Sequence, residues 1–490
     1  MKRRIILYTL GRLLMGEGFL MLIPVFAGLY FKEKETLSVA IVAVLVFLAG
    51  FLVQLKKPKK QTIRAREGFV ITAMAWIILS VVGAIPFIVT GAIPSFTDAV
   101  FETASGFTTT GASVIPDLEI IPKCILLWRS FTHWIGGMGI LMFMLIFIPS
   151  NADEMNIMRA ESPGPSVEKM VPKVRETAKN LYIIYGVMTL VLILALVIAG
   201  MPFFDSVCLS FGTAGTGGFG IHGDSIAGYS YVCQNIITVG MLLFGVNFNV
   251  YYLLIMKKFK SLLRSEEVLW YFVIYFIAVL LVTIGTFKGI VSFAGAEGAA
   301  GFQTVGESIH HSAFQVASVM TTTGYATVDF NNWADMPKAI MVIVMFIGAC
   351  AGSTGGGMKV SRWVLYFKQV VRELQNYIHP KSVKSIRLDG KAVNDNVLRT
   401  TNVYFMAFFI IYTVSFIIIC LDGFDIVTSF TAVAATINNI GPGLGMVGPT
   451  GSFAHFSILS KWVFIFDMIA GRLELIPVLI MLAPGTWRRK

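Results

Sequence analysis

The chain alternates between long apolar runs and short segments that carry most of its charged residues. A helix of about 20 apolar residues crosses the roughly 30 Å hydrocarbon core of a bilayer. Ten runs come close to this length, so the pattern predicts an all-α polytopic membrane protein with both termini on one side. The predicted spans are 5–30, 38–55, 68–91, 124–148, 180–200, 233–256, 268–287, 338–358, 402–421 and 461–483.

The composition excludes a water-soluble globule. Of the 490 residues, 56% are hydrophobic and 14% are charged, whereas soluble domains carry roughly 25% charged residues. The first apolar run is longer than the roughly 7–15 residues of a signal-peptide core, and no small-residue cleavage site follows it. We therefore expect this run to be a retained span.

The net charge of +11 follows the predicted topology. Thirty of the 39 Lys and Arg residues fall in segments on the N-terminal side of the membrane, and six fall on the other side. Basic residues concentrate in cytoplasmic loops, so both termini are expected in the cytoplasm. The same distribution excludes a role in binding nucleic acid.

Related glycine-rich motifs recur between the spans. The segments 101–113, 208–220, 314–326 and 431–443 each carry a glycine ten residues after their start, at separations of 107, 106 and 117 residues. Such a period indicates an internal duplication. The stretch before each glycine is too short to cross a bilayer, which favours a re-entrant helix buried by protein or lining water. Four converging copies would form a pore, and four unrelated surface loops are the alternative.

The chemistry of the motifs suits a monovalent cation. A dehydrated cation needs oxygen ligands, and glycine lets successive carbonyls point into a pore. The four turns contain no acidic side chain, which favours K⁺ or Rb⁺ over a divalent ion that needs carboxylates. Nearby acids either steer cations or are ordinary loop acids and helix caps: Asp98, Glu102, Asp117, Glu119, Asp205, Asp224, Glu307 and Asp329.

Several motifs together resemble the Trk/Ktr/HKT superfamily of potassium transporters, specifically its bacterial Trk-type subunit. They are TTTGAS (108–113), RAESPGP (159–165), GGFG (217–220), TTTGYA (321–326), GACAGSTGGGMKV (348–360), NNIGPGLG (438–445) and AGRLEL (470–475). The resemblance implies four non-identical span–pore-helix–span repeats around one ion pathway, preceded by two additional helices. The implied divisions are an N-terminal extension (1–67), repeat 1 (68–179), repeat 2 (180–264), repeat 3 with a broken inner helix and a basic cytoplasmic segment (265–400) and repeat 4 (401–490).

By position, the resemblance implies a K⁺ selectivity filter with three residues from each repeat. These are Thr109, Thr110 and Gly111; Thr216, Gly217 and Gly218; Thr322, Thr323 and Gly324; and Asn439, Ile440 and Gly441. In relatives, serine in place of the first of these glycines goes with sodium permeation, so glycine at all four positions favours potassium. The fourth turn departs most from fourfold symmetry.

A cluster of small residues interrupts the span after the third motif. It contains Gly348, Gly352, Ser353, Thr354, Gly355, Gly356 and Gly357. Each glycine costs a helix about 1 kcal/mol relative to alanine, and Gly–Ser/Thr clusters break helices. We therefore expect a loop beneath the filter, which the resemblance implies is a gate. Close helix packing through small residues is the alternative.

Arg472 lies in the middle of the last predicted span. An arginine at this depth costs roughly 2.5–3.5 kcal/mol and normally faces a cavity or a partner. The resemblance implies that it projects into the pathway below the filter, where it would repel K⁺. A structural ion pair inside the bundle is the alternative. Arg129 lies near the outer third of its span, from where it could snorkel to the membrane surface, and is assigned no role. Arg12 and Glu17 are assigned no role either, and a loose intrahelical pair is expected between them.

The sequence leaves two transport mechanisms open and predicts that the chain is not an enzyme. A channel would pass K⁺ down its gradient. A symporter coupled to Na⁺ or H⁺ needs a second ion site or a titrating intramembrane acid, for which the last span offers Asp467 and Glu474. An intramembrane enzyme would need clustered His, Asp, Cys or Ser residues within the spans, and the sequence has no such cluster.

The expected partners follow from the cytoplasmic surface and from the resemblance. The basic segment 359–400 either contacts anionic lipid headgroups or docks a regulatory subunit. The chain has no P-loop or dinucleotide-binding motif, so no organic cofactor is expected on it. The transported K⁺ is its expected ligand. The resemblance implies a homodimer in the bacterial inner membrane and a cytosolic, TrkA-like ring of nucleotide-binding regulatory subunits.

Overall fold

The computed structural model describes residues 3–55, 65–139, 174–257, 265–288, 300–380 and 385–487, and these residues form an almost entirely helical fold. Within them, six helical segments are long and apolar enough to cross a membrane: 4–31, 36–54, 65–89, 178–198, 266–286 and 395–422. They are built from α1 (Arg3–Leu20), α2 (Leu22–Phe31), α3 (Thr36–Gln54), α4 (Ala65–Gly83), α5 (Ile85–Val89), α10 (Val174–Ile198), α15 (Glu266–Thr286) and α20 (Asp395–Ile419). Each corresponds to a span predicted from the sequence.

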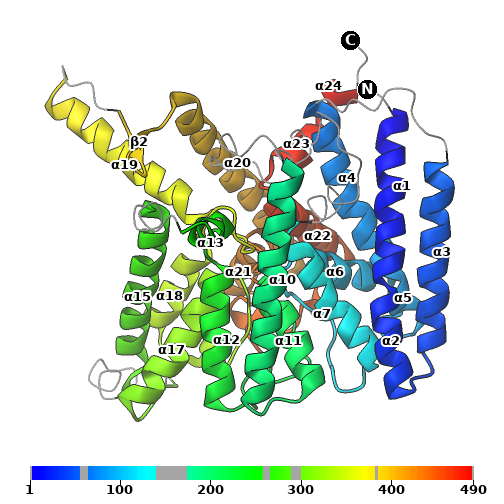
Figure 1. Ribbon diagram of the computed structural model, residues 1–490. Helices are drawn as coiled ribbons and strands as arrows, with labels where there is room; N and C mark the ends of the chain where they lie inside the picture. The colour runs from blue at the N-terminus through cyan, green and yellow to red at the C-terminus, as the bar shows by residue number, and fades with distance from the viewer. Residues whose placement is uncertain are drawn as a thin grey trace.

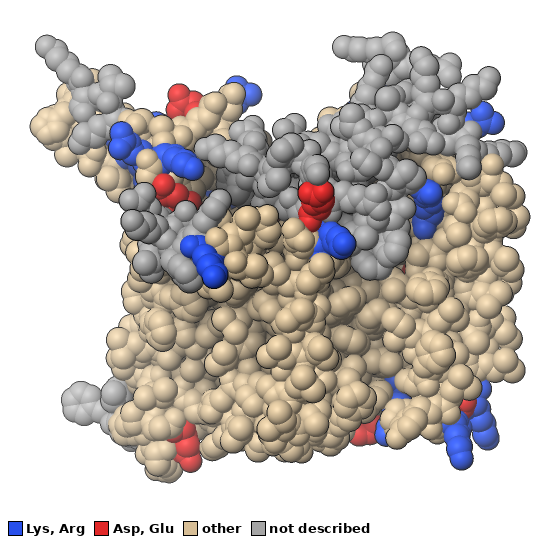
Figure 2. Space-filling model, viewed as in Figure 1, with Lys and Arg blue, Asp and Glu red and all other residues tan. Residues whose placement is uncertain are grey.

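The surface has the charge distribution of a membrane protein. Figure 2 shows charged side chains at two opposite ends of the molecule and a broad uncharged band between them. Large apolar side chains are exposed along several spans, among them Leu48, Leu190, Ile277 and Ile410 at 47–59% exposure. Apolar surface of this extent is stable against lipid rather than water. The start of α1 and the short helix α24 (Pro484–Trp487) lie on the same face (Figure 1).

A shorter helix precedes each glycine-rich motif. These pore helices are α6 (Phe96–Phe107), α11 (Phe203–Gly215), α17 (Val305–Met320) and α21 (Ile426–Ile437). Their 12, 13, 16 and 12 residues are too few to span a bilayer, as predicted. Three of them begin at a side-chain cap, with Ser95, Thr304 or Asp425 accepting the N–H three residues later. The hydroxyl and N–H of Thr428 hold the pKa of Asp425 below its usual range.

The helix that follows each motif, called the inner helix below, breaks near its middle. In repeat 3 this break was predicted, and α18 (Asp335–Met345) is separated from α19 (Val360–Ile378) by a long loop. Two other spans were predicted to be continuous, and that prediction was wrong. Span 233–256 consists of α12 (Tyr231–Phe244) and α13 (Phe248–Ile255), which meet at 88°. Span 461–483 consists of α22 (Ile458–Arg472) and α23 (Ile476–Leu482).

The inner helix of repeat 1, α7 (Lys123–Gly137), also ends early, and residues 140–148 of the predicted span lie outside the described residues. Close backbone approaches accompany two of these ends. A Cβ added to Gly136 would lie 1.8 Å from the carbonyl oxygen of Phe107, and one added to Gly471 would lie 1.9 Å from that of Ile437. Hydropathy over a 20-residue window does not register such local events, because the apolar residues on either side keep the average high, even where Arg472 and Glu474 lie at the break.

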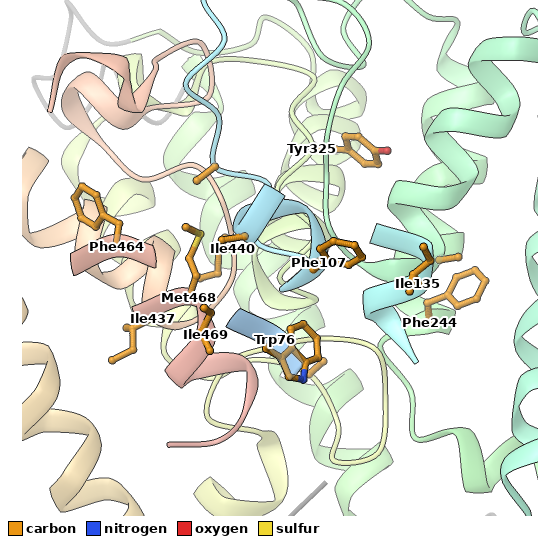
Figure 3. Packing of buried hydrophobic residues seen from close by; sticks show 14 of the residues in the cluster. Trp76, Phe107, Ile135, Phe244, Tyr325, Ile437, Ile440, Phe464, Met468 and Ile469 are labelled. Carbon is orange, nitrogen blue, oxygen red and sulfur yellow. The ribbon is translucent and has the colours of Figure 1, made fainter. Parts of the chain in front are cut away.

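Buried apolar side chains fill the space between the pore helices and the inner helices. Figure 3 shows Phe107, Ile437 and Ile440 from the pore-helix side packed near Met468 of α22 and Trp76 of α4. Because lipid is as apolar as these side chains, close packing and hydrogen bonds hold such helices together. On the face that carries α24, α19 extends away from the body of the molecule (Figure 1), and β1 (Arg387–Leu388) pairs with β2 (Lys391–Ala392) nearby.

Candidate ion pathway

Each pore helix ends in a turn of the same left-handed conformation. The first residue of each turn has φ between 53° and 59°: Thr109, Thr216, Thr322 and Asn439. The third has φ between 73° and 96°: Gly111, Gly218, Gly324 and Gly441. Positive φ is unfavourable for a β-branched residue. The surrounding structure must therefore hold the three threonines in place.

The same two backbone hydrogen bonds close all four turns. The N–H of the first residue donates to the carbonyl three residues earlier at 3.1 Å, and that of the second donates to the carbonyl five residues earlier at 2.8 Å. In repeat 1 these bonds run from Thr109 to Gly106 and from Thr110 to Ser105. This is the Schellman helix ending, in which glycine is usual at the left-handed position. The divergent Asn-Ile-Gly turn of repeat 4 therefore has the backbone of the other three.

The four turns close into a ring. A Cβ added to Gly111 would lie 2.1 Å from the carbonyl oxygen of Gly217, the middle residue of the next turn. The same relation joins Gly218 to Thr323 (1.8 Å), Gly324 to Ile440 (2.1 Å) and Gly441 to Thr110 (2.7 Å). Each repeat thus contacts the next, and the fourth contacts the first. Glycine is needed at these four positions both for its φ and for this close approach.

A cavity of about 150 Å³ lies on one side of the ring and is lined by all four of its glycines. Its other lining residues are Arg129 of α7 and residues from the segments after the turns, including Ser113, His222 and Thr450, and none of the lining residues is acidic. The cavity is the mouth of the candidate pathway. Backbone carbonyls and hydroxyls, rather than carboxylates, face an ion at this point.

Three of the acids predicted near the mouth make local contacts. Asp98 pairs with Lys461 at 2.6 Å, and Asp205 accepts the Tyr229 hydroxyl at 3.0 Å. Asp329 caps the short helix that follows it. For these residues the structure favours caps and structural contacts over steering of cations.

Behind the ring, repeats 1 and 3 use the same pair of threonines. The hydroxyl of the middle residue bonds to the threonine two positions earlier, Thr110 to Thr108 at 2.8 Å and Thr323 to Thr321 at 2.7 Å. These bonds hold the middle residue against the end of its own pore helix. They give repeats 1 and 3 an internal support for the turn.

Repeats 2 and 4 lack this pair. In repeat 4 the middle residue is Ile440, and the side-chain amide of Asn439 instead donates to the Thr110 hydroxyl and to the Met468 carbonyl, both at 2.9 Å. In repeat 2 the middle residue is Gly217, which has no side chain. The common backbone conformation is therefore supported in a different way in these two repeats.

The loop between α18 and α19 lies against the opposite side of the ring. The Gly356 N–H donates to the Thr322 hydroxyl at 2.6 Å. A Cβ added to Gly356 would lie 2.6 Å from the carbonyl oxygen of Asn438, and one added to Gly355 would lie 2.9 Å from that of Thr321. The predicted gate residues thus lie beside the turns of repeats 3 and 4, on the side away from the mouth.

The small residues of this loop are not in a helix. Three of its glycines have φ between 71° and 78°: Gly348, Gly352 and Gly357. The Ser353 hydroxyl donates to the Cys350 carbonyl at 2.7 Å, and the Thr354 hydroxyl donates to the Phe244 carbonyl of α12 at 3.1 Å. The small residues therefore shape an intramembrane loop and do not form the alternative helix-packing surface.

Glu267, at the start of α15, joins the loop to the first turn of α19. Its carboxylate accepts the N–H groups of Ala351 at 2.6 Å and Ser361 at 3.2 Å. The Cys350 N–H also donates to the Gly245 carbonyl, at the break between α12 and α13, at 3.1 Å. Nothing in the sequence marks Glu267 as a site residue, because only the fold brings it to the loop.

Arg472 is the last residue of α22 and connects three repeats. Its guanidinium donates to the carbonyls of Thr354 at 2.7 Å, Gly136 at 2.6 Å and Gly137 at 2.8 Å. Thr354 belongs to the loop, and the two glycines end α7. The predicted arginine below the filter is thus a cross-link between backbone segments. Glu474, two residues later, pairs with Arg362 of α19 instead.

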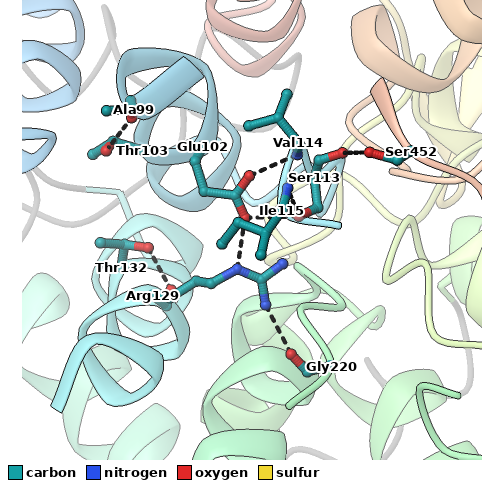
Figure 4. Close-up of polar contacts among 10 residues, drawn as sticks. All are labelled: Ala99, Glu102, Thr103, Ser113, Val114, Ile115, Arg129, Thr132, Gly220 and Ser452. Carbon is teal, nitrogen blue, oxygen red and sulfur yellow. Dashed lines mark hydrogen bonds and ion pairs between the residues drawn. The ribbon is translucent and has the colours of Figure 1, made fainter. Parts of the chain in front are cut away.

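Glu102 and Arg129 form a buried ion pair beside the mouth, a contact that was not predicted from the sequence. Arg129 Nε lies 2.6 Å from Glu102 Oε1, and Arg129 Nη1 donates to the Gly220 carbonyl at 2.7 Å. The same carboxylate accepts the Ser113 hydroxyl at 3.0 Å and the Val114 N–H at 2.9 Å (Figure 4). Arg129 therefore does not snorkel, and the pair joins the segments that follow the turns of repeats 1 and 2.

Two intramembrane acids have unsatisfied oxygens. Among the described residues, neither carboxylate oxygen of Glu17 has a hydrogen-bond partner, so the expected pair with Arg12 is not formed. Asp467 Oδ1 accepts the Ser415 hydroxyl at 2.8 Å, while its Oδ2 has no partner in the described part of the chain. Both side chains are buried.

Comparison with known proteins agrees with this geometry. The TrkH family, described as a cation transport protein family, matches residues 36–487. The Trk system potassium uptake protein TrkH of Halomonas elongata is 32% identical over 100% of both chains, and that of Escherichia coli is 36% identical over 88% of both. The crystal structure of the potassium transporter TrkH from Vibrio parahaemolyticus superposes with a TM-score of 0.85 at 30% identity, covering 100% of both chains.

These similarities extend over the whole length of the chain and confirm both the predicted fold class and the predicted superfamily. The relatives are transporters and not enzymes, as the sequence also predicted. The chain belongs to the TrkH family of cation transport proteins.

Proposed function

We propose that this chain is the membrane subunit of a bacterial potassium uptake system and passes K⁺, and also Rb⁺, through the ring of four turns. The observation that carries the proposal is the closed ring itself, in which each glycine lies against a carbonyl of the next repeat. A carbonyl ring without carboxylates suits a large monovalent ion. The names of the relatives, which are potassium uptake proteins, support the same ion.

In this proposal the ring is the selectivity filter. Its ligands come from the twelve residues 109–111, 216–218, 322–324 and 439–441. Their carbonyl dipoles replace the water that K⁺ loses on entry. The pore helices end at these turns, so their negative ends stabilise a cation next to the ring on the side away from the mouth.

The loop at 346–359 is proposed as the gate. It lies against the ring on the side away from the mouth, and Gly356 bonds directly to Thr322 of the filter. Arg472 cross-links the loop to the end of α7 and places a positive charge near the pathway. Opening requires the loop to leave these contacts and the arginine to release at least the Thr354 carbonyl.

The proposed setting is the bacterial inner membrane, with both termini in the cytoplasm, as the distribution of basic residues predicts. We also propose a homodimer and control by a cytosolic, TrkA-like ring of nucleotide-binding subunits. The relatives are named as proteins of a Trk system, which supports association with other components. The proposed repeat boundaries remain 68–179, 180–264, 265–400 and 401–490, after the extension 1–67.

Purified full-length protein in liposomes tests this proposal. Under matched outward gradients, K⁺ and Rb⁺ flux should exceed Na⁺ flux, and all three should fall when Gly324 is replaced by alanine. Equal K⁺ and Na⁺ flux, or none with and without the regulatory ring, would contradict it.

A second mechanism, K⁺ symport with Na⁺ or H⁺, is favoured by the buried carboxyls of Glu17 and Asp467, which have unpartnered oxygens. Coupling by either acid predicts that K⁺ flux follows an imposed pH or Na⁺ gradient and that Glu17→Gln or Asp467→Asn abolishes this dependence. K⁺ flux that ignores both gradients in the wild type would exclude symport and leave the channel mechanism.

A further inference from the structure

The turn of repeat 2 is the only one of the four with no side chain at its middle position. Gly217 is not among the residues with positive φ, so its backbone would accept a side chain. Space is what prevents one. A Cβ added to Gly217 would lie 2.3–2.5 Å from three ring atoms of His133, on α7 of repeat 1. The imidazole therefore occupies the volume that a side chain at position 217 would need.

His133 and Arg129, one helical turn apart on α7, hold the rest of this turn. The His133 ring stacks on Phe219 with 4.1 Å between centroids and 25° between planes. Arg129 Cζ lies 3.5 Å from the centroid of the same phenyl ring, and its guanidinium donates to the Gly220 carbonyl. α7 therefore contacts the turn and its exit at Gly217, Phe219 and Gly220.

The helix that carries His133 lies unusually close to the pore helix of repeat 2. A Cβ added to Gly215, the last residue of α11, would lie 2.2 Å from the His133 carbonyl oxygen. Buried and closely packed, the imidazole has little room to move away from Gly217. Arg129 is fixed in turn by Glu102 of α6, so the support for repeat 2 is anchored in repeat 1.

The contact between His133 and the turn is one of shape. Neither ring nitrogen has a hydrogen-bond partner within the described residues. A buried polar atom without a partner costs free energy. An aromatic hydrocarbon of similar size should therefore support the turn equally well and leave the protein more stable.

We propose that His133 is a specificity-determining positioning residue: its ring replaces the missing side chain of Gly217 and sets where the Gly217 and Gly218 carbonyls lie in the ring. It acts through the turn and does not touch the ion. Without it, these carbonyls relax into the vacated volume, and the ring discriminates less between K⁺ and the smaller Na⁺. The role rests on the proposed function of the ring as a K⁺ filter.

The first test measures K⁺ and Na⁺ flux under matched gradients with full-length protein in liposomes. His133→Ala should lower the K⁺/Na⁺ flux ratio by about tenfold while K⁺ flux stays within roughly threefold of wild type, because carbonyl placement decides selection. His133→Phe should keep the ratio and raise the melting temperature. An unchanged ratio in His133→Ala, or a loss in His133→Phe equal to that in alanine, would overturn the proposal.

The second test exchanges the two ways of filling this volume. Gly217→Thr, which gives repeat 2 the Thr-Thr-Gly sequence of repeats 1 and 3, should abolish flux because its side chain collides with His133. Combining it with His133→Ala should restore K⁺ flux and much of the selectivity. A double variant no better than Gly217→Thr alone would overturn the proposal. The double variant refills the volume that the imidazole leaves, so it tests the role of His133 even if His133→Ala alone does not fold.

Trp134→Phe is the matched control, since it alters the next residue of α7, whose indole donates to Thr189 and not to the turn. Its flux ratio should stay at the wild-type value. The two proposals fail in different ways. A wild-type protein that shows no preference for K⁺ contradicts the filter, whereas a K⁺-selective wild type with an unchanged His133→Ala ratio contradicts only the role of His133.

Discussion

The two sides of the ring show what the repeats have in common and where they differ. At the ring, four turns with different sequences share their φ values and their hydrogen bonds. Beyond it, away from the mouth, the four inner helices end or break in four ways. α7 stops at Gly137, α12 bends by 88° into α13, α18 opens into a loop of more than ten residues, and α22 breaks at Glu474 and Leu475.

This difference follows from what each side has to do under the proposed function. An ion on the axis needs ligands from all repeats at the same height, so one distorted turn affects the whole site. A gate needs one element with two arrangements. Among the described residues, the break in repeat 3 forms a long loop, while carbonyls at the ends of α12 and α7 bond to this loop or to Arg472. Four sets of variants test this difference, beginning with the set whose effect should be greatest.

Alanine at any glycine of the ring tests whether the four repeats are equivalent. Each variant should reduce K⁺ flux by at least about 100-fold, because the Cβ displaces a neighbouring ligand by an ångström or more. Gly218→Ala should be most severe and Gly441→Ala least, since their Cβ atoms would lie 1.8 Å and 2.7 Å from the next carbonyl.

Gly423→Ala is the control, because Gly423 has φ of 77° and nothing within 4 Å of an added Cβ. It should show only the cost of backbone strain, seen as a lower melting temperature. If one ring glycine tolerates alanine with normal flux, the four turns are not functionally equivalent.

Arg472→Ala tests the side of the ring that carries the loop. The variant loses hydrogen bonds to three carbonyls, and bonds from a charged donor contribute about 1.5–3 kcal/mol each. It also removes a positive charge near the pathway. We expect K⁺ flux without the regulatory ring to rise by roughly tenfold. The flux of Arg472→Lys should lie between that of the wild type and that of Arg472→Ala. Unchanged or lost flux in Arg472→Ala would contradict the proposed role of the loop and Arg472 as a gate.

Glu267→Ala removes the link between the loop and the first turn of α19 while leaving Arg472 in place. Flux should rise by about threefold, less than for Arg472→Ala, because the loop keeps its hydrogen bond to α12 and, through Arg472, its link to the end of α7. Glu267→Gln is the matched control. The N–H groups of Ala351 and Ser361 donate to the same carboxylate oxygen of Glu267. The side-chain amide oxygen of glutamine can accept both bonds in its place. A glutamine variant as active as alanine would show that the charge, not the two bonds, is what matters.

Tyr325→Phe makes the smallest change, at the residue that follows the ring in repeat 3. The Tyr325 hydroxyl donates to the Leu209 carbonyl of α11 at 3.1 Å, and its loss should cost about 1 kcal/mol of stability. The aromatic ring of residue 325 stays packed in the variant, so the K⁺/Na⁺ flux ratio should change by less than about twofold. Tyr412→Phe removes a comparable bond, to the Phe430 carbonyl at 2.8 Å. The two variants should lower the melting temperature equally, and a much larger loss of selectivity in Tyr325→Phe would show that this bond also positions the filter.

The residues around the ring show which contacts could not be predicted from the sequence. Glu102 and Arg129 were both noticed, one as a mouth acid and one as a snorkelling arginine, yet 27 residues separate them and nothing local indicates that they pair. His133 gave no signal, because its importance depends on the missing side chain of Gly217, which lies in another repeat. The breaks in α12–α13 and α22–α23 were missed because their flanking residues are apolar enough to read as continuous spans.

The sequence by itself determined the spans, the fourfold duplication, the pore helices and the positions of the ring glycines. These are local properties: hydropathy over about 20 residues marks a span, and a glycine ten residues into each motif marks a turn that needs positive φ. Tertiary structure decided which carbonyls Arg472 binds, how Glu267 holds the loop and what supports each turn from behind. Those contacts join residues far apart in the chain, and only the packing of the repeats around one axis brings them within hydrogen-bond distance.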